Sequence, residues 1–160
     1  MANPFAHSRW FHRLGNAFVA PLFRLGPMPA GFALLTVTGR KTGRPRTRPV
    51  RAIRRDDTLY AVALLGERSD WLRNARAKPE ITVKLRSRQF EARVRELVDP
   101  AELDAAADLF VREIVPFDYV DYAGYHWGFP TRRKIEEAHR NWVAEGVMVA
   151  IDIEVGKTEK

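Results

Sequence analysis

The pattern of apolar and polar residues predicts six β-strands along this chain, three of them from strict alternation. The clearest case is 80–86, where Ile81, Val83 and Leu85 alternate with polar residues. Such alternation indicates a strand, because successive side chains of a strand point to opposite faces. The same reasoning predicts strands over 90–94 and 147–155. An apolar run predicts a buried strand over Phe32–Thr38, and extended or β-favouring residues predict strands over 47–54 and 58–65. Short connections between the first three favour antiparallel pairing, since parallel strands need a longer crossover.

Other segments carry helical patterns. Within 8–25, Trp10, Leu14, Phe18 and Leu22 recur every four residues, which is typical of an amphipathic helix. Caps at Ser69 and Asp99 and a breaker at Gly146 predict further helices over 69–77, 99–114 and 131–145. We expect the N-terminal helix within 1–26 to pack on the core. Because the helix also has a basic face, contact with a membrane surface or with a partner protein is the alternative.

Six mostly antiparallel strands with flanking helices predict an α+β fold. A small antiparallel sheet removes its exposed edges when it curls into a barrel. We therefore expect one domain over 1–160, built on a closed or partly closed β-barrel, with a loose tail at 156–160. The segment 117–130, which is rich in aromatic residues, receives no assignment from periodicity.

Composition agrees with a single core and limits the chemistry. Of the 160 residues, 46% are hydrophobic, which supplies enough apolar surface for one domain. The absence of cysteine excludes disulfides and thiolate metal sites, and the four histidines show no metal-ligand spacing. We find no apolar run of membrane-spanning length and no signal-peptide pattern, so we expect a cytoplasmic protein.

Positive charge is concentrated in the first part of the chain. Residues 1–98 hold 20 of the 27 Lys and Arg residues but only 7 of the 20 Asp and Glu residues. Such a field favours an anionic partner, which the sequence leaves open between a small phosphate or carboxylate ligand, a membrane surface and nucleic acid.

The strongest candidate for anion binding is the stretch 39–49, which we call the basic segment. Two glycines bend it, two prolines stiffen it, and it carries five cations: Arg40, Lys41, Arg44, Arg46 and Arg48. It matches neither a P-loop nor a Rossmann fingerprint, because the glycine spacing differs and no helix follows. From the residues alone, it could hold a phosphate-bearing cofactor, bind nucleic acid or form a solvated surface.

Two motifs resemble those of the deazaflavin-dependent nitroreductase family. One is 34–49, which contains the basic segment, and the other is 69–79, in which Trp71, Asn74 and Pro79 lead into a strand. The resemblance implies a split β-barrel that binds coenzyme F(420), an 8-hydroxy-5-deazaflavin with a phosphodiester and an oligoglutamate tail. It also implies an oxidoreductase that transfers hydride between the reduced deazaflavin and a small acceptor such as a quinone, an enone or a nitro compound.

The resemblance also implies a role for individual residues. Cations of the first motif would hold the phosphate and tail, while the end of the third strand and the second motif would border the deazaflavin ring. The implied cofactor-binding residues are Arg40, Lys41, Thr42, Arg46, Arg48, Leu64, Leu65, Gly66, Trp71 and Asn74, with Arg44 assisting at the tail. Arg51 stands where some relatives carry an aromatic residue near the substrate, and 66–70 is shorter than the corresponding loop of nitroreductases.

The aromatic segment 117–130 is our candidate for the substrate wall, since its tyrosines combine flat apolar faces with hydroxyl groups. Tyr122 or Tyr125 is the candidate catalytic residue, which would stabilise or protonate the reduced acceptor. Because some split barrels bind FMN or haem, an FMN-dependent, haem-binding or cofactor-sequestering protein is the main alternative. We expect no nucleic-acid partner and leave a homodimer open.

Overall fold

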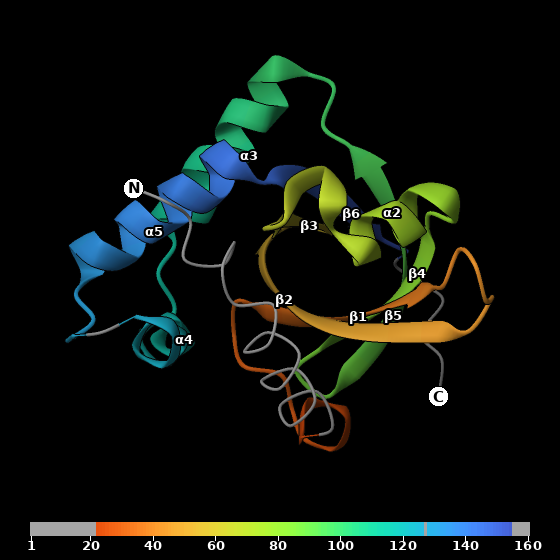
Figure 1. Cartoon of the computed structure of the whole chain (residues 1–160), viewed down its shortest axis with the longest axis horizontal. Coiled ribbons are helices and arrows are strands. Elements are labelled where there is room, and N and C mark those ends of the chain that lie inside the picture. The colour runs from red at the N-terminus through yellow and green to blue at the C-terminus, as the bar shows by residue number, and fades with distance from the viewer. Residues whose placement is uncertain (1–21, 127, 155–160) are drawn as a thin grey trace.

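The computed structural model describes residues 22–126 and 128–154. Its centre is a closed barrel in the strand order β1-β2-β3-β6-β5-β4 (Figure 1). The strands are β1 (Phe32–Thr38), β2 (Pro45–Arg55), β3 (Thr58–Ala63), β4 (Glu80–Leu85), β5 (Arg88–Glu96) and β6 (Val147–Ile153). Every neighbouring pair is antiparallel, which confirms the predicted barrel.

Apolar residues from alternate strand positions fill the barrel. Leu35, Val83, Val149 and Ile151 are fully buried in one cluster. Burial of such side chains is the main favourable term in folding, at roughly 1.5–3 kcal/mol each. Where apolar and polar residues alternate along a strand, as in β4, they do so because every second side chain points into this barrel interior.

Helices cover the barrel on two sides. The helices are α2 (Asp70–Ala77), α3 (Pro100–Arg112), α4 (Pro116–Tyr125) and α5 (Arg132–Glu145), and a short 3-10 helix, η2 (Gly66–Arg68), precedes α2. Figure 1 shows α3 and α5 side by side against the outside of the barrel, where Phe110 of α3 packs with Ile53 and Met148. In contrast, α2 sends Trp71 and Leu72 into the barrel interior cluster.

The second strand begins two residues earlier than predicted and contains Pro49. Residues of β2 from Pro45 to Arg51 pair with β1, but pairing with β3 begins only at Ala52. The first part of β2 therefore has one strand neighbour, so a residue without an N–H group is tolerated there.

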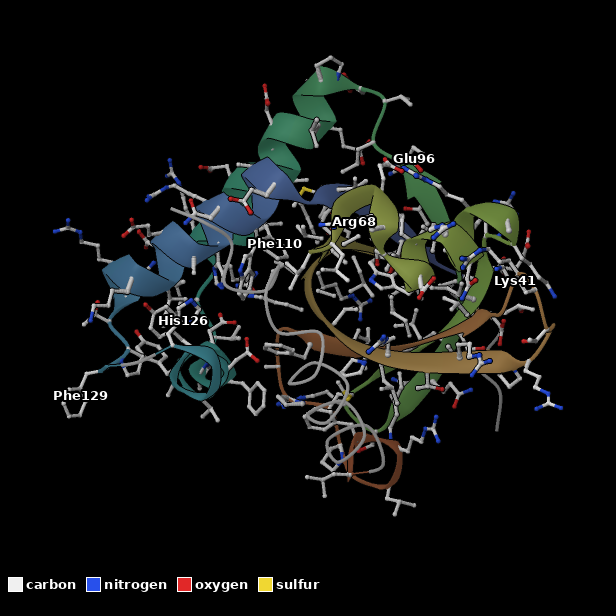
Figure 2. The ribbon with its side chains drawn as sticks, viewed as in Figure 1. Lys41, Arg68, Glu96, Phe110, His126 and Phe129 are labelled. Carbon is white, nitrogen blue, oxygen red and sulfur yellow. The ribbon has the colours of Figure 1, made fainter. Side chains whose placement is uncertain are left out.

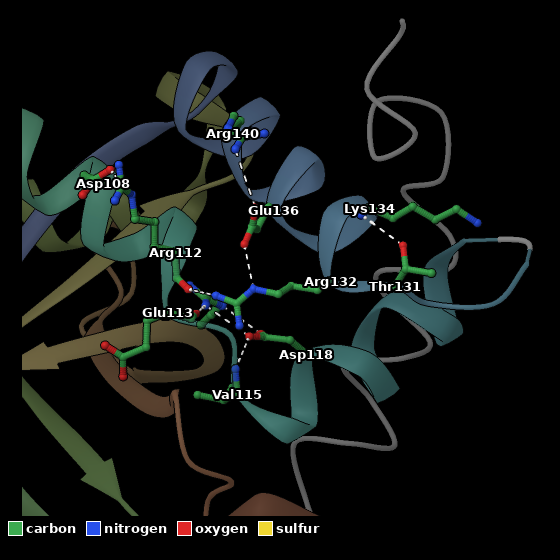
Figure 3. A network of polar contacts seen from close by, with 11 residues as sticks. Asp108, Arg112, Glu113, Val115, Asp118, Thr131, Arg132, Lys134, Glu136 and Arg140 are labelled. Carbon is green, nitrogen blue, oxygen red and sulfur yellow. Dashed lines mark hydrogen bonds and ion pairs between the residues drawn. The ribbon is translucent and has the colours of Figure 1, made fainter.

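The segment 116–125 forms a helix that periodicity did not reveal. Pro116 occupies the first turn, where a missing N–H costs nothing, and Oδ2 of Asp118 accepts a hydrogen bond from the Val115 N–H at 2.8 Å (Figure 3). Apolar residues lie all around this helix, and Val120 is exposed. That distribution hides the helical period, because no single face is apolar.

Two predicted helix boundaries depend on different contacts from those expected. Ser69 does precede α2, but its side chain makes no capping hydrogen bond. Gly146 follows the last residue of α5 at a crowded place: a Cβ atom there would lie 2.5 Å from Cγ1 of Val62 and 2.7 Å from the Trp142 carbonyl oxygen. Its φ of −90° is open to any residue, so close packing explains the glycine.

The termini are described only in part. Of the helix expected within 1–26, residues 22–25 are described and are helical. The expected tail at 156–160 lies outside the described residues. None of the described helices has the length and apolar character that crossing a membrane requires.

Candidate functional site

A cavity of about 670 Å³ lies between the basic segment and α2. We call it the basic cavity. Its lining residues are Arg24, Val37, Gly39, Arg40, Lys41, Thr42, Pro45, Arg46, Thr47, Arg48, Asp70, Trp71 and Asn74. The two motifs, some 30 positions apart in the sequence, thus meet at one site, and the size is typical of pockets that bind small molecules.

Hydrogen bonds within the turn between β1 and β2 hold the backbone that carries its cations. The Gly39 N–H donates to the Arg44 carbonyl at 2.8 Å, and the Gly43 N–H donates to the Gly39 carbonyl at 2.7 Å. Gly43 has a φ of 65°, which favours glycine. Figure 2 shows Lys41 at the outer end of this turn. A closed turn loses little further entropy when its cations bind a ligand.

Arg40 joins the basic segment to α2. Its guanidinium donates to Oδ1 of Asn74 at 2.8 Å and to Oδ1 of Asp70 at 3.2 Å, and its backbone N–H donates to the same Asn74 oxygen at 3.1 Å. Asn74 is buried. Arg40 and Asn74, both expected to bind cofactor, are therefore brought together and contact each other.

The other cations of the basic segment lack such partners. Lys41, Arg46 and Arg48 line the cavity and form no ion pair within the described part of the chain. Arg46 and Arg48 lie opposite Val37 and Leu35 of β1. Since opposite residues share a face of a sheet, both arginines lie on the face that turns toward the barrel interior and α2.

Three expected ring contacts lie outside this lining. Leu64 and Leu65 follow β3, and Gly66 begins η2. Leu64 packs beside the cluster under α3 and α5, and Leu65 is 42% exposed. The three residues precede Trp71 in the sequence, and Trp71 does line the cavity and is 8% exposed. Contact of Leu64, Leu65 and Gly66 with a ring remains a prediction.

The candidate catalytic tyrosines belong to α4. Tyr122 stacks on His126, with ring centroids 4.1 Å apart and planes 7° apart, and it does not line the basic cavity. The side chain of Tyr125 is outside the described part of the molecule. Figure 2 shows His126 on the side of the molecule away from Lys41. A catalytic role for either tyrosine stays a prediction.

Arg51 lies inside the protein and holds three elements together. Its guanidinium donates to Oδ1 of Asp118 at 2.8 Å, to the Phe110 carbonyl at 2.9 Å and to the Glu113 carbonyl. It also lies over the Phe110 ring, 4.4 Å from the centroid. Arg51 thus links β2 to the end of α3 and the start of α4, and these contacts occupy its charge.

Two titratable groups beside this ion pair have shifted pKa values. Burial, with a further contribution from the Asp118 charge, raises the pKa of Asp121 to about 6. Burial, reinforced by Arg51, lowers the pKa of His139 to about 4, although Asp118 acts in the opposite sense. Nε2 of His139 lies 3.8 Å from Oδ1 of Asp118, so the network extends to α5.

Sequence reasoning missed Arg24, Thr47 and Asp70 as lining residues. Arg24 belongs to a predicted helix with several arginines, and nothing in the pattern distinguishes it from a solvated residue. Asp70 lies within the second motif and could have been found as the natural partner of a nearby cation. No group of acidic or histidine residues suited to a metal ion occurs in 22–126 or 128–154.

Comparison with known proteins agrees with this geometry. The family model described as F(420)H(2)-dependent quinone reductase matches residues 8–135, which is most of the chain. A solved structure of an F(420)-H(2)-dependent reductase (FDR-A) is similar with a TM-score of 0.51 at 20% identity, covering 80% of this chain and 97% of that one. Another, described as a domain-swapped dimer, has a TM-score of 0.52 at 17% identity, covering 89% and 98%.

At these identities the two solved structures establish the barrel fold alone. The family model covers both motifs of the basic cavity, and it agrees with the resemblance of these motifs to the deazaflavin-dependent nitroreductases. The chain therefore belongs to the F(420)H(2)-dependent quinone reductase family and is an oxidoreductase.

Proposed function

We propose that the protein binds reduced coenzyme F(420) through the basic cavity and uses it to reduce a small organic acceptor, of which a quinone is the first candidate. The observation that carries the proposal is that cations with no ion pair among the described residues meet Trp71 and Asn74 in one cavity. This donor set suits a ligand that is anionic at one end and has a flat ring at the other.

The chain supplies the contacts at the anionic end. Lys41, Arg46 and Arg48 would hold the phosphate and the glutamate carboxylates, with the Thr42 hydroxyl as a further donor. Arg40 would act mainly as a brace, because Asp70 and Asn74 already occupy its guanidinium. A fixed Arg40 keeps the neighbouring Lys41 in place before the ligand arrives.

The remaining contacts position the reaction. Bound reduced deazaflavin supplies a hydride to the acceptor. Trp71 would border the ring, and the backbone at Leu64, Leu65 and Gly66 would exclude water beside it. Tyr122 or Tyr125 would stabilise or protonate the reduced acceptor, an assignment that requires α4 to border the acceptor. Such positioning would accelerate the reaction by holding the coenzyme and the acceptor in the orientation that hydride transfer requires.

FMN or haem binding without this turnover is the alternative, because a cation cluster would also accept the FMN phosphate. Nucleic-acid binding loses support at the hairpin of β4 and β5. Lys84 there donates to backbone carbonyls, Arg93 pairs with Glu80, and Arg95 pairs with Glu102 and Asp152. These three cations are engaged within the protein, whereas Arg86 of the same hairpin is exposed and forms no ion pair in the described part of the chain.

Titration with oxidised coenzyme F(420), followed by absorbance, tests the proposal. We expect saturable binding at micromolar concentration and a loss of at least about 100-fold in affinity for Lys41→Ala with Arg46→Ala, because two charge-assisted contacts disappear. Arg55→Ala with Arg133→Ala removes the same charge from exposed positions outside the cavity and serves as the control. Binding of FMN or haem in place of the deazaflavin would overturn the proposal.

The acceptor is identified by oxidation of the reduced coenzyme in the presence of a quinone, an enone or a nitroaromatic compound. We expect the quinone to be reduced fastest. A homodimer is a further proposal, supported only by the domain-swapped dimer among similar structures, and light scattering of the purified chain would test it.

A further inference from the structure

We propose that Arg24 is a fourth ligand-binding cation of the basic cavity and that Lys84, outside the cavity, positions it. The inference rests on the proposed function for the identity of the natural ligand, but its chemistry is that of an anion site. Arg24 lines the cavity together with Lys41, Arg46 and Arg48, and it forms no ion pair in the described part of the chain.

The backbone around Arg24 is held on both sides by buried neighbours. Phe23 is 9% exposed and Met28 is fully buried, and both belong to a cluster with Phe32 and Leu34 of β1. The Met28 N–H also donates to the Arg86 carbonyl at 2.9 Å. The segment that carries Arg24 is therefore docked on the barrel although Arg24 itself is exposed.

Lys84 completes this docking. Its ammonium group donates to three backbone carbonyls, those of Phe23 at 3.0 Å, Arg24 at 2.8 Å and Gly26 at 2.9 Å. Three donors on one ammonium match three carbonyls left unpaired at the end of the helical turn at 22–25. The group thereby caps this turn and fixes the position from which the Arg24 side chain extends.

The consequence is an anion site built from two separate parts of the chain. The basic segment supplies Lys41, Arg46 and Arg48, whereas Arg24 comes from the segment before β1. A ligand with a single anionic group cannot contact four cations equally. The arrangement suits a ligand with at least two anionic groups, phosphate or carboxylate, and Arg24 would contact one of their oxygens.

Binding of inorganic triphosphate to the full chain, measured by calorimetry at physiological salt, tests the role of Arg24 without any deazaflavin. We expect wild type to bind saturably and Arg24→Gln to bind about tenfold more weakly, the size of one lost charge-assisted hydrogen bond. Arg55→Gln removes the same charge at an exposed position outside the cavity, and we expect a change below about twofold because salt screens it. Failure of wild type to bind, or equal losses in both variants, would overturn the proposal.

A double-mutant cycle tests the role of Lys84. Lys84→Met should weaken triphosphate binding, but adding it to Arg24→Gln should cause little further loss, because a positioning residue acts only through its target. Full additivity of the two losses would show that Lys84 does not act through Arg24. If coenzyme F(420) fails to bind while triphosphate behaves as expected, the proposed function fails and this inference stands.

Discussion

Arg51 shows how a single residue can serve structure at a position expected to border the substrate. Its side chain and that of Asp118 are 4% and 1% exposed, and Asp118 also caps the start of α4. A buried ion pair is costly to form, and removal of one partner leaves the other charge without compensation. We therefore regard Arg51 as the residue that holds α4 and the end of α3 on the barrel.

Substitution of Arg51 tests this role. Arg51→Met should lower the free energy of unfolding by about 3–5 kcal/mol, because Asp118 stays buried without its partner. Arg54→Met, which breaks a pair with Asp57 that is largely exposed, should cost less than about 1 kcal/mol. Urea denaturation measures both. Similar losses would contradict the role, and Arg51→Met with Asp118→Leu should recover part of the stability even if the single variant folds poorly.

The pH dependence of stability follows from Asp121 and His139. The folded chain holds a proton on Asp121 up to a pKa of about 6, above the ordinary 3.8, so this group lowers stability as pH rises from about 4 to 6. His139 has its pKa lowered to about 4 from 6.5, so it lowers stability as pH falls through the same range. The two effects offset each other in wild type.

Asp121→Asn should uncover the histidine effect. The difference in free energy of unfolding, variant minus wild type, should rise by about 2 kcal/mol from pH 4 to pH 6. This value is smaller than the full pKa shift would give, because the carboxylate is partly exposed. Urea denaturation at several pH values measures the difference. A difference independent of pH would show that Asp121 titrates as an ordinary aspartate.

Among the secondary-structure elements, the junction of α5 and β6 depends on close packing. Because a Cβ atom at Gly146 would overlap Val62, Gly146→Ala should destabilise the fold by about 1–3 kcal/mol. At Gly124, inside α4, an added Cβ atom would meet nothing within 4 Å, so Gly124→Ala should stabilise by up to about 1 kcal/mol. Thermal unfolding separates the two, and a shift of the same sign in both would contradict this account.

The elements also show what sequence can and cannot predict. Strands β1 and β4 were found to within one residue for different reasons. One face of β4 is buried, which imposes alternation, whereas both faces of β1 are largely buried, which gives a nearly continuous apolar run. The helix α4 was missed because its apolar residues lie all around it. Both motifs of the cavity were found, since each is contiguous. Arg24 was missed as a lining residue because its place in the cavity depends on a turn docked by Lys84, a contact across 60 positions that no local pattern encodes.

For the molecule as a whole, the charge excess of the first part is distributed unevenly. Some arginines away from the cavity are paired, Arg76 with Glu67 and Glu96 and Arg95 with Glu102 and Asp152. Others, such as Arg55 and Arg73, are exposed and form no ion pair in the described part of the chain. The pKa of Glu67 is lowered by its hydrogen bond to Arg76, in keeping with this pairing. What distinguishes the basic cavity is that Lys41, Arg46 and Arg48 line one hollow and form no ion pair among the described residues, so their combined field would attract an anionic ligand.

The most direct measurement compares two ligands in one protein: oxidised coenzyme F(420) and its ring-bearing fragment, which lacks the phosphate and the glutamate tail. We predict that wild type binds the complete coenzyme at least about 100-fold more tightly, because several charge-assisted contacts depend on the anionic end. In Lys41→Ala with Arg46→Ala this preference should nearly vanish. Equal affinity of wild type for the two ligands would contradict the account.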